Sequence, residues 1–314
     1  MPRPARQSKI PSTQIRQPGN SDVPRIGAGN APVVDPRNLL NDLSGAEWIQ
    51  ETKSFVFQKG LGAAHPHAAI EREHPAPFSF QDIQRLIGFF TKNDQVVLDP
   101  FAGVGSTAKA CALIGRKSIN IELSKRWHDL AVKRLRTEVG PRALSGHEFI
   151  RGDSRTVLPG LKQESVHFVV TSPPYWSILT KRPDHKAKER IKSHLATKYS
   201  DDVRDLGNLT SYDLFLDEIV EVFRQSARAL MTKRYMAIVV SDFRHGSRLY
   251  PFHSDLIQRL GSTGEADRIL ALQGVKVLLQ NHKGLKPYGY PFAYVENIHH
   301  QYILIFQKQK VVTP

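Results

Sequence analysis

Residues 96–107 read Val-Val-Leu-Asp-Pro-Phe-Ala-Gly-Val-Gly-Ser-Thr, a short apolar run that passes into a glycine-rich turn. The apolar run predicts a strand that is buried on both faces. Gly103 and Gly105 allow a sharp turn and a close approach of the backbone to a ligand, because they carry no Cβ. Ser106 or Thr107 can cap the helix that follows. A strand, a glycine turn and a helix in this order are typical of doubly wound sheets, which bind ligands at such turns.

The same alternation continues along the chain. We expect strands at 118–121, 148–150, 166–170, 235–240, about 274–280 and 302–307. A first helix is expected to begin at about residue 80, and further helices are expected at 106–115, 124–139, 212–230 and 252–260. One or two short helices are expected within 39–60. Strands that alternate with helices predict an α/β fold, namely a Rossmann-like, doubly wound and mostly parallel sheet with helices on both faces.

Composition sets the expected domain organisation. Residues 1–35 are rich in Pro, Ser, Gln, Gly and Arg and predict a disordered basic tail. Residues 36–310 are expected to form a single domain. Within it, the polar stretch 177–210 interrupts the regular pattern and is interpreted as an insertion loop.

Charge and cysteine content exclude several classes of protein. The chain has 44 Lys+Arg and 30 Asp+Glu, so its net charge is +14, which favours an anionic partner such as nucleic acid. Cys111 is the only cysteine, so a disulfide framework and a cysteine-based zinc site are excluded, and a cytoplasmic location is expected. The histidines have no acidic partner at suggestive spacing, so no metal site is predicted. The sequence also lacks a membrane span and a secretory signal, so no membrane partner is expected.

Two acidic residues follow the next two expected strands. Glu122 closes the strand after the glycine turn, where an acidic residue hydrogen-bonds ribose hydroxyls. The alternative is an acid that stabilises the start of a helix through the helix dipole. Asp153 ends the third strand in the equivalent place and would contact an adenine ring, or it is simply a turn residue.

The second informative turn is Thr171-Ser-Pro-Pro-Tyr-Trp176, at the end of the fourth expected strand. Two prolines restrict its backbone and leave carbonyl oxygens as hydrogen-bond acceptors. A rigid carbonyl, a serine hydroxyl and an aromatic ring in one turn suit a flat ligand that carries an exocyclic amine. Trp176 forms either a wall of this site or part of the core, and Phe101 either contacts a cofactor or packs into the sheet.

At these positions the sequence resembles the amino-group DNA methyltransferases, which use S-adenosylmethionine to methylate N4 of cytosine or N6 of adenine. The resemblance covers roughly residues 75–308, and its motifs lie at 74–78 (His-Pro-Ala-Pro-Phe), 99–107, 122, 153, 172–175, 239–244 and 300–306. It implies a methyltransferase fold with one catalytic domain over 36–310 and S-adenosylmethionine as the cofactor. The implied cofactor-binding residues are Pro77, Phe78, Asp99, Phe101, Gly103, Gly105, Thr107, Glu122 and Asp153. The implied catalytic residues are Ser172, Pro173, Pro174 and Tyr175.

The Ser-Pro-Pro-Tyr form of the catalytic turn is typical of N4-cytosine enzymes in this family. The resemblance therefore implies a site-specific methyltransferase that acts on a flipped cytosine in double-stranded DNA. The setting would be a restriction-modification system, with a separate cognate restriction endonuclease, or an orphan enzyme. N6-adenine methylation by the same site is the main alternative, followed by methylation of RNA or of a protein amide. A non-catalytic DNA-binding module is the alternative from another class.

Two further features bear on these alternatives. Many Ser-Pro-Pro-Tyr enzymes carry the catalytic turn before the cofactor turn, whereas here the cofactor turn comes first and leaves no room for a recognition domain between the two. Methylation at carbon-5 of cytosine needs a thiolate nucleophile, and Cys111 lies inside an expected helix, so that chemistry is excluded.

Two basic stretches are candidates for contacting DNA. The first directly follows the catalytic turn and carries six cations that would bind phosphates: Lys181, Arg182, Lys186, Lys188, Arg190 and Lys192. The alternative is a solvated loop without a partner. In the second, at 281–290, basic and aromatic residues interleave.

Overall fold

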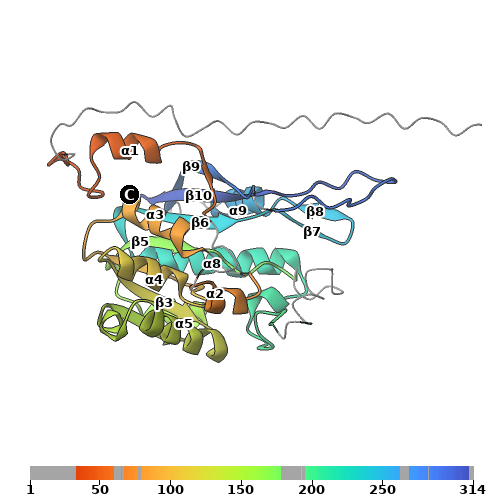
Figure 1. Cartoon of the computed structure of the whole chain (residues 1–314), viewed down its shortest axis with the longest axis horizontal. Coiled ribbons are helices and arrows are strands. Elements are labelled where there is room, and N and C mark those ends of the chain that lie inside the picture. The colour runs from red at the N-terminus through yellow and green to blue at the C-terminus, as the bar shows by residue number, and fades with distance from the viewer. Residues whose placement is uncertain are drawn as a thin grey trace, which may run out of the picture. The chain divides into compact units, whose positions relative to one another are not determined.

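The computed structural model describes residues 33–59, 65, 67–76, 79–177, 192, 195–261, 269–281 and 283–310. The described residues from 34 onward belong to one compact unit. The basic tail predicted for 1–35 lies almost wholly outside the described residues. Within the compact unit, the described residues build a mixed sheet with helices on both faces (Figure 1).

The described strands form an eight-stranded sheet in the order β1-β9-β10-β6-β5-β2-β3-β4. They are β1 (Phe55–Phe57), β2 (Val96–Asp99), β3 (Lys117–Glu122), β4 (His147–Arg151), β5 (Val166–Thr171), β6 (Leu230–Val240), β9 (Leu270–Leu279) and β10 (His300–Lys308). Neighbouring strands are parallel, except that β10 runs antiparallel to both β6 and β9. The predicted Rossmann-like, mostly parallel architecture is confirmed. A small antiparallel hairpin, β7 (Phe243–His245) and β8 (Arg248–Tyr250), lies outside the sheet.

The helices cover the sheet on two sides. They are α1 (Gly45–Glu51), α2 (Ala68–Glu73), α3 (Phe80–Phe90), α4 (Ser106–Leu113), α5 (Lys125–Glu138), α6 (Ser154–Val157), α8 (Tyr212–Ala229) and α9 (Phe252–Gly261). Successive residues of the central strands enter two different cores. Val97, Phe168 and Val170 pack with α3 and α4, whereas Leu98 and Val169 pack with α8 and α9. Burial on both faces explains why these strands are continuous apolar runs in the sequence.

The order of the strands places a topological switch point beside β2. The chain passes from β2 outward through β3 to β4 and then returns to β5, which pairs with β2 on its other side. The connections after β2 and after β5 therefore leave the carboxyl edge of the sheet in opposite directions. Ligands of open α/β sheets bind at such a switch point. The loops after Asp99 and Thr171 are therefore the candidate site.

The structure adds elements that the sequence pattern did not predict. The short helix expected within 39–60 is α1, whose N-cap Ser44 forms a capping box with Glu47. The strand β1, the helix α2 and the β7–β8 hairpin were not expected. Each has only three to six residues, which is too short for a hydrophobic period to be recognised. None of the described helices is long and apolar enough to cross a membrane.

Candidate active site

The glycine turn after β2 has a backbone that only glycine adopts readily. Gly103 and Gly105 have φ values of +51° and +73°. A Cβ on Gly105 would lie 2.9 Å from the Cβ of Ala131 on α5, so the turn also needs glycine for close packing. Gly103 faces the His74 ring, and a Cβ there would lie 3.4 Å from His74 Nε2. The turn thus holds α4 against α5 and leaves its backbone close to His74.

Asp99 ties the glycine turn to the end of β5. Its buried carboxylate accepts hydrogen bonds from Thr107 Oγ1 at 2.5 Å, from Thr171 Oγ1 at 2.6 Å and from the Phe101 amide at 3.0 Å. Burial raises the pKa of the Asp99 carboxyl, and the three hydrogen bonds act against that rise. Asp99 therefore links the two predicted turns directly, because Thr171 is the residue before Ser172.

Glu122 is the last residue of β3 and faces the glycine turn. Its carboxylate accepts the amide hydrogens of Gly103 and Ser124, both at 2.8 Å. Burial raises the pKa of Glu122 to about 7, although the two backbone hydrogen bonds oppose the rise. No cation pairs with it among the residues that the structure describes. A carboxylate held by backbone donors in this position has acceptor capacity left for the hydroxyls of a ribose.

Asp153 caps α6 and is covered by an arginine. Its side chain accepts the Arg155 amide at 2.9 Å and pairs with the Arg155 guanidinium at 2.6 Å. Burial raises the pKa of Asp153, but the hydrogen bonds from Arg155 outweigh it and leave the pKa below its ordinary value. Arg155 also pairs with Glu218 on α8 at 2.8 Å. Asp153 is thus a turn residue, and it also lies at the carboxyl edge of the sheet, where a contact with adenine is predicted.

The Pro-Pro turn follows β5 directly. The ring of Tyr175 packs edge-on against Phe243 and Phe252, with centroid distances of 6.0 and 5.9 Å, and Gln301 Nε2 donates to its hydroxyl at 3.4 Å. Burial raises the pKa of Tyr175 to about 12, and hydrogen bonds that include one with the Ser172 side chain act against this rise. Tyr175 is therefore neutral at physiological pH and is held from behind by the core.

The sequence allows Trp176 and Phe101 either a place in the site or a place in the core. Both side chains are packed in the structure. Trp176 is buried, and its Nε1 donates to the Leu209 carbonyl at 2.8 Å. Its ring also lines a cavity of about 370 Å³ together with Tyr212 and Tyr250. Phe101 packs against the core, with its ring edge-on to Phe223 at 6.5 Å.

Three aromatic residues near the glycine turn were missed as site residues. The His74 ring lies 4.9 Å from the ring of Trp127 and 5.7 Å from that of Tyr199. Trp127 Nε1 donates to the Tyr199 carbonyl at 2.6 Å, which joins α5 to the stretch before α8. His74 opens the His-Pro-Ala-Pro-Phe motif, which is a signal in the sequence. Trp127 and Tyr199 carry no comparable signal.

A buried ionic cluster joins the helices around the glycine turn, and the sequence pattern did not predict it. On α5, Arg134 pairs with Glu71 of α2 at 2.7 Å and with Glu138 at 3.1 Å, and it donates to Ser106 Oγ at 2.9 Å. Lys109 of α4 pairs with Glu138 at 2.6 Å. Burial lowers the pKa of Lys109 and raises that of Glu71. The cluster fastens the first residue of α4 to α2 and α5.

Several predicted site residues cannot be placed. Those outside the described residues are Pro77, Phe78, Lys181, Arg182, Lys186, Lys188 and Arg190. Lys192 is described and exposed. Among the predicted residues that are described, Asp99 accepts hydrogen bonds from Thr107 and from Thr171, the residue before Ser172. Glu122 accepts the amide hydrogen of Gly103.

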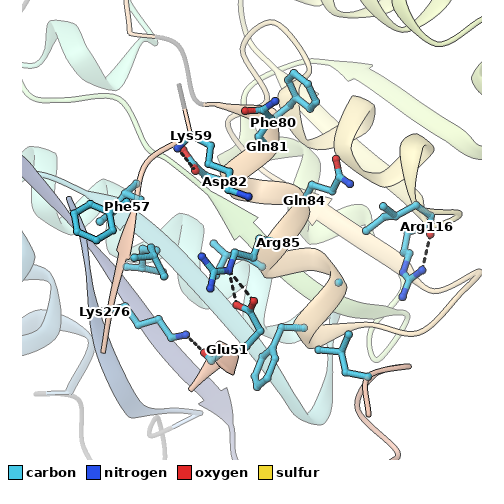
Figure 2. Close-up of a pocket in the computed structure, with 18 of the residues that line it drawn as sticks. Glu51, Phe57, Lys59, Phe80, Gln81, Asp82, Gln84, Arg85, Arg116 and Lys276 are labelled. Carbon is cyan, nitrogen blue, oxygen red and sulfur yellow. Dashed lines mark hydrogen bonds and ion pairs between the residues drawn. The ribbon is translucent and has the colours of Figure 1, made fainter. Parts of the chain in front are cut away.

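A larger cavity of about 740 Å³ lies elsewhere, against α3 and the strands β1 and β9 (Figure 2). In it, Arg85 pairs with Glu51 at 2.6 Å, and Asp82 accepts the Lys59 amide at 3.1 Å. Within the described part of the chain, its lining includes no residue of the glycine turn or of the Pro-Pro turn. The cavity is thus separate from the candidate active site.

The two linked turns lie at the switch point of a Rossmann-like α/β sheet. The glycine turn follows the first central strand, Glu122 ends the next strand, and the Pro-Pro turn lies across the switch point. A family model described as DNA methylase matches residues 45–133, which contain the glycine turn and Glu122 but not the Pro-Pro turn. Residues 45–133 are therefore similar to the DNA methylase family, over less than a third of the chain.

Known proteins match the chain over limited stretches. It is 36% identical over 87 residues to the type II methyltransferase M.ScaI of Streptomyces caespitosus, a match that covers 28% of this chain and 29% of M.ScaI. It is 38% identical over 87 residues to the type II methyltransferase M.MthZI of Methanothermobacter thermautotrophicus, covering 26% of this chain and 24% of that protein. The chain therefore matches less than a third of the length of either relative.

Among solved structures, TrmN from Thermus thermophilus has a TM-score of 0.45 and 16% identity, over 77% of this chain and 52% of that chain. A putative DNA modification methylase from the same species, solved with S-adenosyl-L-methionine, has a TM-score of 0.34 and 27% identity, over 52% of this chain and 56% of that chain.

Proposed function

We propose that the protein transfers a methyl group from S-adenosylmethionine to the exocyclic N4 amine of a cytosine in double-stranded DNA. The observation that carries the proposal is the Asp99 carboxylate, which joins Thr107 of the glycine turn to Thr171 beside Ser172. A donor-binding turn and an amine-binding turn held by one side chain suit a group transfer between two bound molecules.

The residues around the glycine turn are suited to holding the cofactor. The Glu122 carboxylate would accept hydrogen bonds from the ribose hydroxyls, Asp153 would contact the adenine, and the backbone of the glycine turn would bind the methionine end. Pro77 and Phe78 complete the set by resemblance to the family. S-adenosylmethionine supplies an electrophilic sulfonium methyl group when it is bound.

The Pro-Pro turn deals with the weakness of the nucleophile. The amine nitrogen of cytosine is a poor nucleophile because its lone pair is delocalised into the ring. We assign Ser172 Oγ and the Pro173 carbonyl as hydrogen-bond acceptors for the two N–H groups of the cytosine amine. These hydrogen bonds favour a tetrahedral nitrogen, whose lone pair is then available for the methyl group. Pro174 keeps the turn rigid, and Tyr175 stacks on a base that has been flipped out of the duplex.

DNA would be held by the basic segment that follows the turn. Lys181, Arg182, Lys186, Lys188, Arg190 and Lys192 are proposed to bind phosphates. The matches to type II methyltransferases support a restriction-modification context, in which a separate endonuclease would be the partner. N6-adenine methylation remains the alternative, because adenine also presents an exocyclic amine to the same acceptors.

The first test is methyl transfer itself. Purified protein is incubated with tritiated S-adenosylmethionine and unmethylated genomic DNA of mixed sequence, and label in the DNA is counted. We expect the wild type to label DNA, and Ser172→Ala to lower the initial rate about 100-fold or more, because one acceptor of the amine is lost. Ser145→Ala, at an exposed serine, is the matched control and should retain the wild-type rate. Absence of label with the wild type, or equal rates for Ser172→Ala and the wild type, would overturn the proposal.

A further inference from the structure

Residues 283–298, which we call the arm, join β9 to β10 and expose large apolar side chains. The exposed fractions are 78% for Leu285, 56% for Tyr288, 80% for Tyr290, 93% for Phe292 and 84% for Tyr294. Soluble proteins rarely expose so many large apolar groups within ten residues, and such patches usually mark an interaction surface. The active site described above uses none of these side chains.

The arm has a defined local structure. At its tip the amides of Phe292 and Ala293 both donate to the Gly289 carbonyl at 2.7 Å. Gly289 has a φ of +73°, and a Cβ there would lie 2.3 Å from the Ala293 oxygen, so the tip requires glycine. Nearer the sheet, the Asn297 side chain accepts the Lys286 amide at 2.9 Å and donates to the Lys286 carbonyl at 2.8 Å. The aromatic rings are therefore presented by a closed, hydrogen-bonded turn.

The base of the arm lies at the candidate active site. β9 runs parallel to β1 and antiparallel to β10, which in turn is antiparallel to β6, so the arm leaves the sheet at the carboxyl edge. In Figure 1 the arm extends beyond the end of the sheet on the side of β7 and β8. At its base, Gln301 donates to the Tyr175 hydroxyl, and Ser241 Oγ donates to the His300 carbonyl at 3.3 Å. The first two residues of β10, which follow the arm, therefore lie at Tyr175 and beside Ser241.

We propose that the arm is a DNA-contacting surface whose aromatic rings lie against the bases or sugars of the duplex beside the target base. This inference rests on the proposed function. Four of the five exposed groups are aromatic, and aromatic rings stack on bases of any sequence where a base face is uncovered, as it is beside a base flipped out of the duplex. Lys283 and Lys286 add positive charge against the single acid Glu296, in a chain of net charge +14. That combination fits nucleic acid better than a purely apolar partner.

The first experiment asks what covers the arm. Phe292 is replaced by the photocrosslinking amino acid p-benzoylphenylalanine, and the full-length protein is irradiated with a labelled DNA duplex of mixed sequence. We expect a protein–DNA adduct that unlabelled duplex suppresses. A crosslink only to a second copy of the chain, or no adduct with DNA, would overturn the inference. The same replacement at Leu39, another exposed apolar residue, is the control and should give no DNA adduct.

The second experiment measures the contribution of the rings. The double variant Tyr290→Ala and Phe292→Ala should bind duplex DNA about tenfold or more weakly than the wild type, because each stacked ring adds to the affinity for nucleic acid. The variants Tyr290→Phe and Phe292→Tyr keep the rings and should bind like the wild type. Binding of S-adenosylmethionine, measured by calorimetry, should be unchanged. Equal duplex affinities for the alanine variant and the wild type would refute the role of the arm.

The two proposals fail in different ways. A wild-type protein that crosslinks to DNA through the arm but transfers no methyl group would contradict the proposed function and would support DNA contact by the arm. A wild-type protein that methylates DNA, with an alanine variant of equal duplex affinity and equal rate, would contradict the arm and support the proposed function.

Discussion

Glu122 is a residue whose chemistry can be tested by titration. Its pKa is raised to about 7 by burial, so the carboxyl is about half protonated at neutral pH. A ribose hydroxyl donates more strongly to the ionised carboxylate than to the neutral acid. Cofactor binding should therefore favour the ionised form, and the affinity should rise as the pH increases through 7.

We predict that the Kd of the wild type for S-adenosylmethionine falls about tenfold between pH 6 and pH 8, which is the change in the ionised fraction of a group with this pKa. The variant Glu122→Gln should bind more weakly and lack this component of the pH dependence. Calorimetry at several pH values measures both proteins, and the variant also reports any titration of the cofactor itself. Parallel pH profiles for the two proteins would contradict the assigned role of Glu122.

Single residues also show what could be predicted from the sequence. Glu122 and the glycines stand at positions that local spacing defines, and the structure places Glu122 on the Gly103 amide. The contact of Asp99 with Thr171 joins residues far apart in the sequence, so no local pattern could reveal it. The roles of Trp127 and Tyr199 likewise depend on a tertiary contact, through the Tyr199 carbonyl.

At the scale of elements, α2, α4 and α5 are joined by buried charges rather than by apolar contacts alone. Arg134 is fully buried and reaches Glu71, Glu138 and Ser106. Removing one member of such a cluster leaves the others buried and without compensation. The cluster therefore makes the position of the glycine turn depend on three helices.

We predict that Arg134→Ala lowers the free energy of unfolding by about 3–5 kcal/mol, because Glu71 and Glu138 lose their partner in a buried setting. Arg136→Ala, at an exposed arginine on the same helix, should change it by less than about 0.5 kcal/mol. Chemical denaturation followed by circular dichroism measures both variants. A loss below about 1 kcal/mol for Arg134→Ala would show that the cluster is not a structural support.

The elements that the sequence predicted are those with long or doubly buried apolar patterns. The strand at 166–170 and the helix at 212–230 were predicted because their apolar patterns are visible without tertiary information, and the structure has them as Val166–Thr171 and Tyr212–Ala229. The strand Phe55–Phe57 was not, since it is three residues long and pairs with a strand more than two hundred residues away. Its short apolar run lacks any local sign of that partner.

At the scale of the whole molecule, the net charge of +14 predicts a strong effect of salt on DNA binding. Each phosphate that a cation neutralises releases counterions, so the affinity falls as salt rises. The basic segment 181–192 follows the Pro-Pro turn in the sequence and is our proposed source of most of this effect.

We predict that duplex affinity falls at least about 100-fold between 50 and 200 mM salt, as expected for several phosphate contacts. Lys186→Gln combined with Lys188→Gln should make the dependence of log affinity on log salt less steep by about two. The matched pair Lys133→Gln and Lys162→Gln, at two exposed lysines of α5 and of the turn before β5, should leave the slope unchanged. Fluorescence anisotropy gives the slopes, and identical slopes for the two double variants would remove the basic segment from the interface.

Methyl transfer to the N4 amine of cytosine is the core of the proposed function, and the identity of the methylated nucleoside is its sharpest test. DNA labelled by the wild type is digested to nucleosides, which are separated and identified by mass. We predict that the label is found in N4-methyldeoxycytidine and is lost with Ser172→Ala. Label in N6-methyldeoxyadenosine would replace cytosine by adenine as the target, and DNA without any methylated nucleoside would contradict the proposed function.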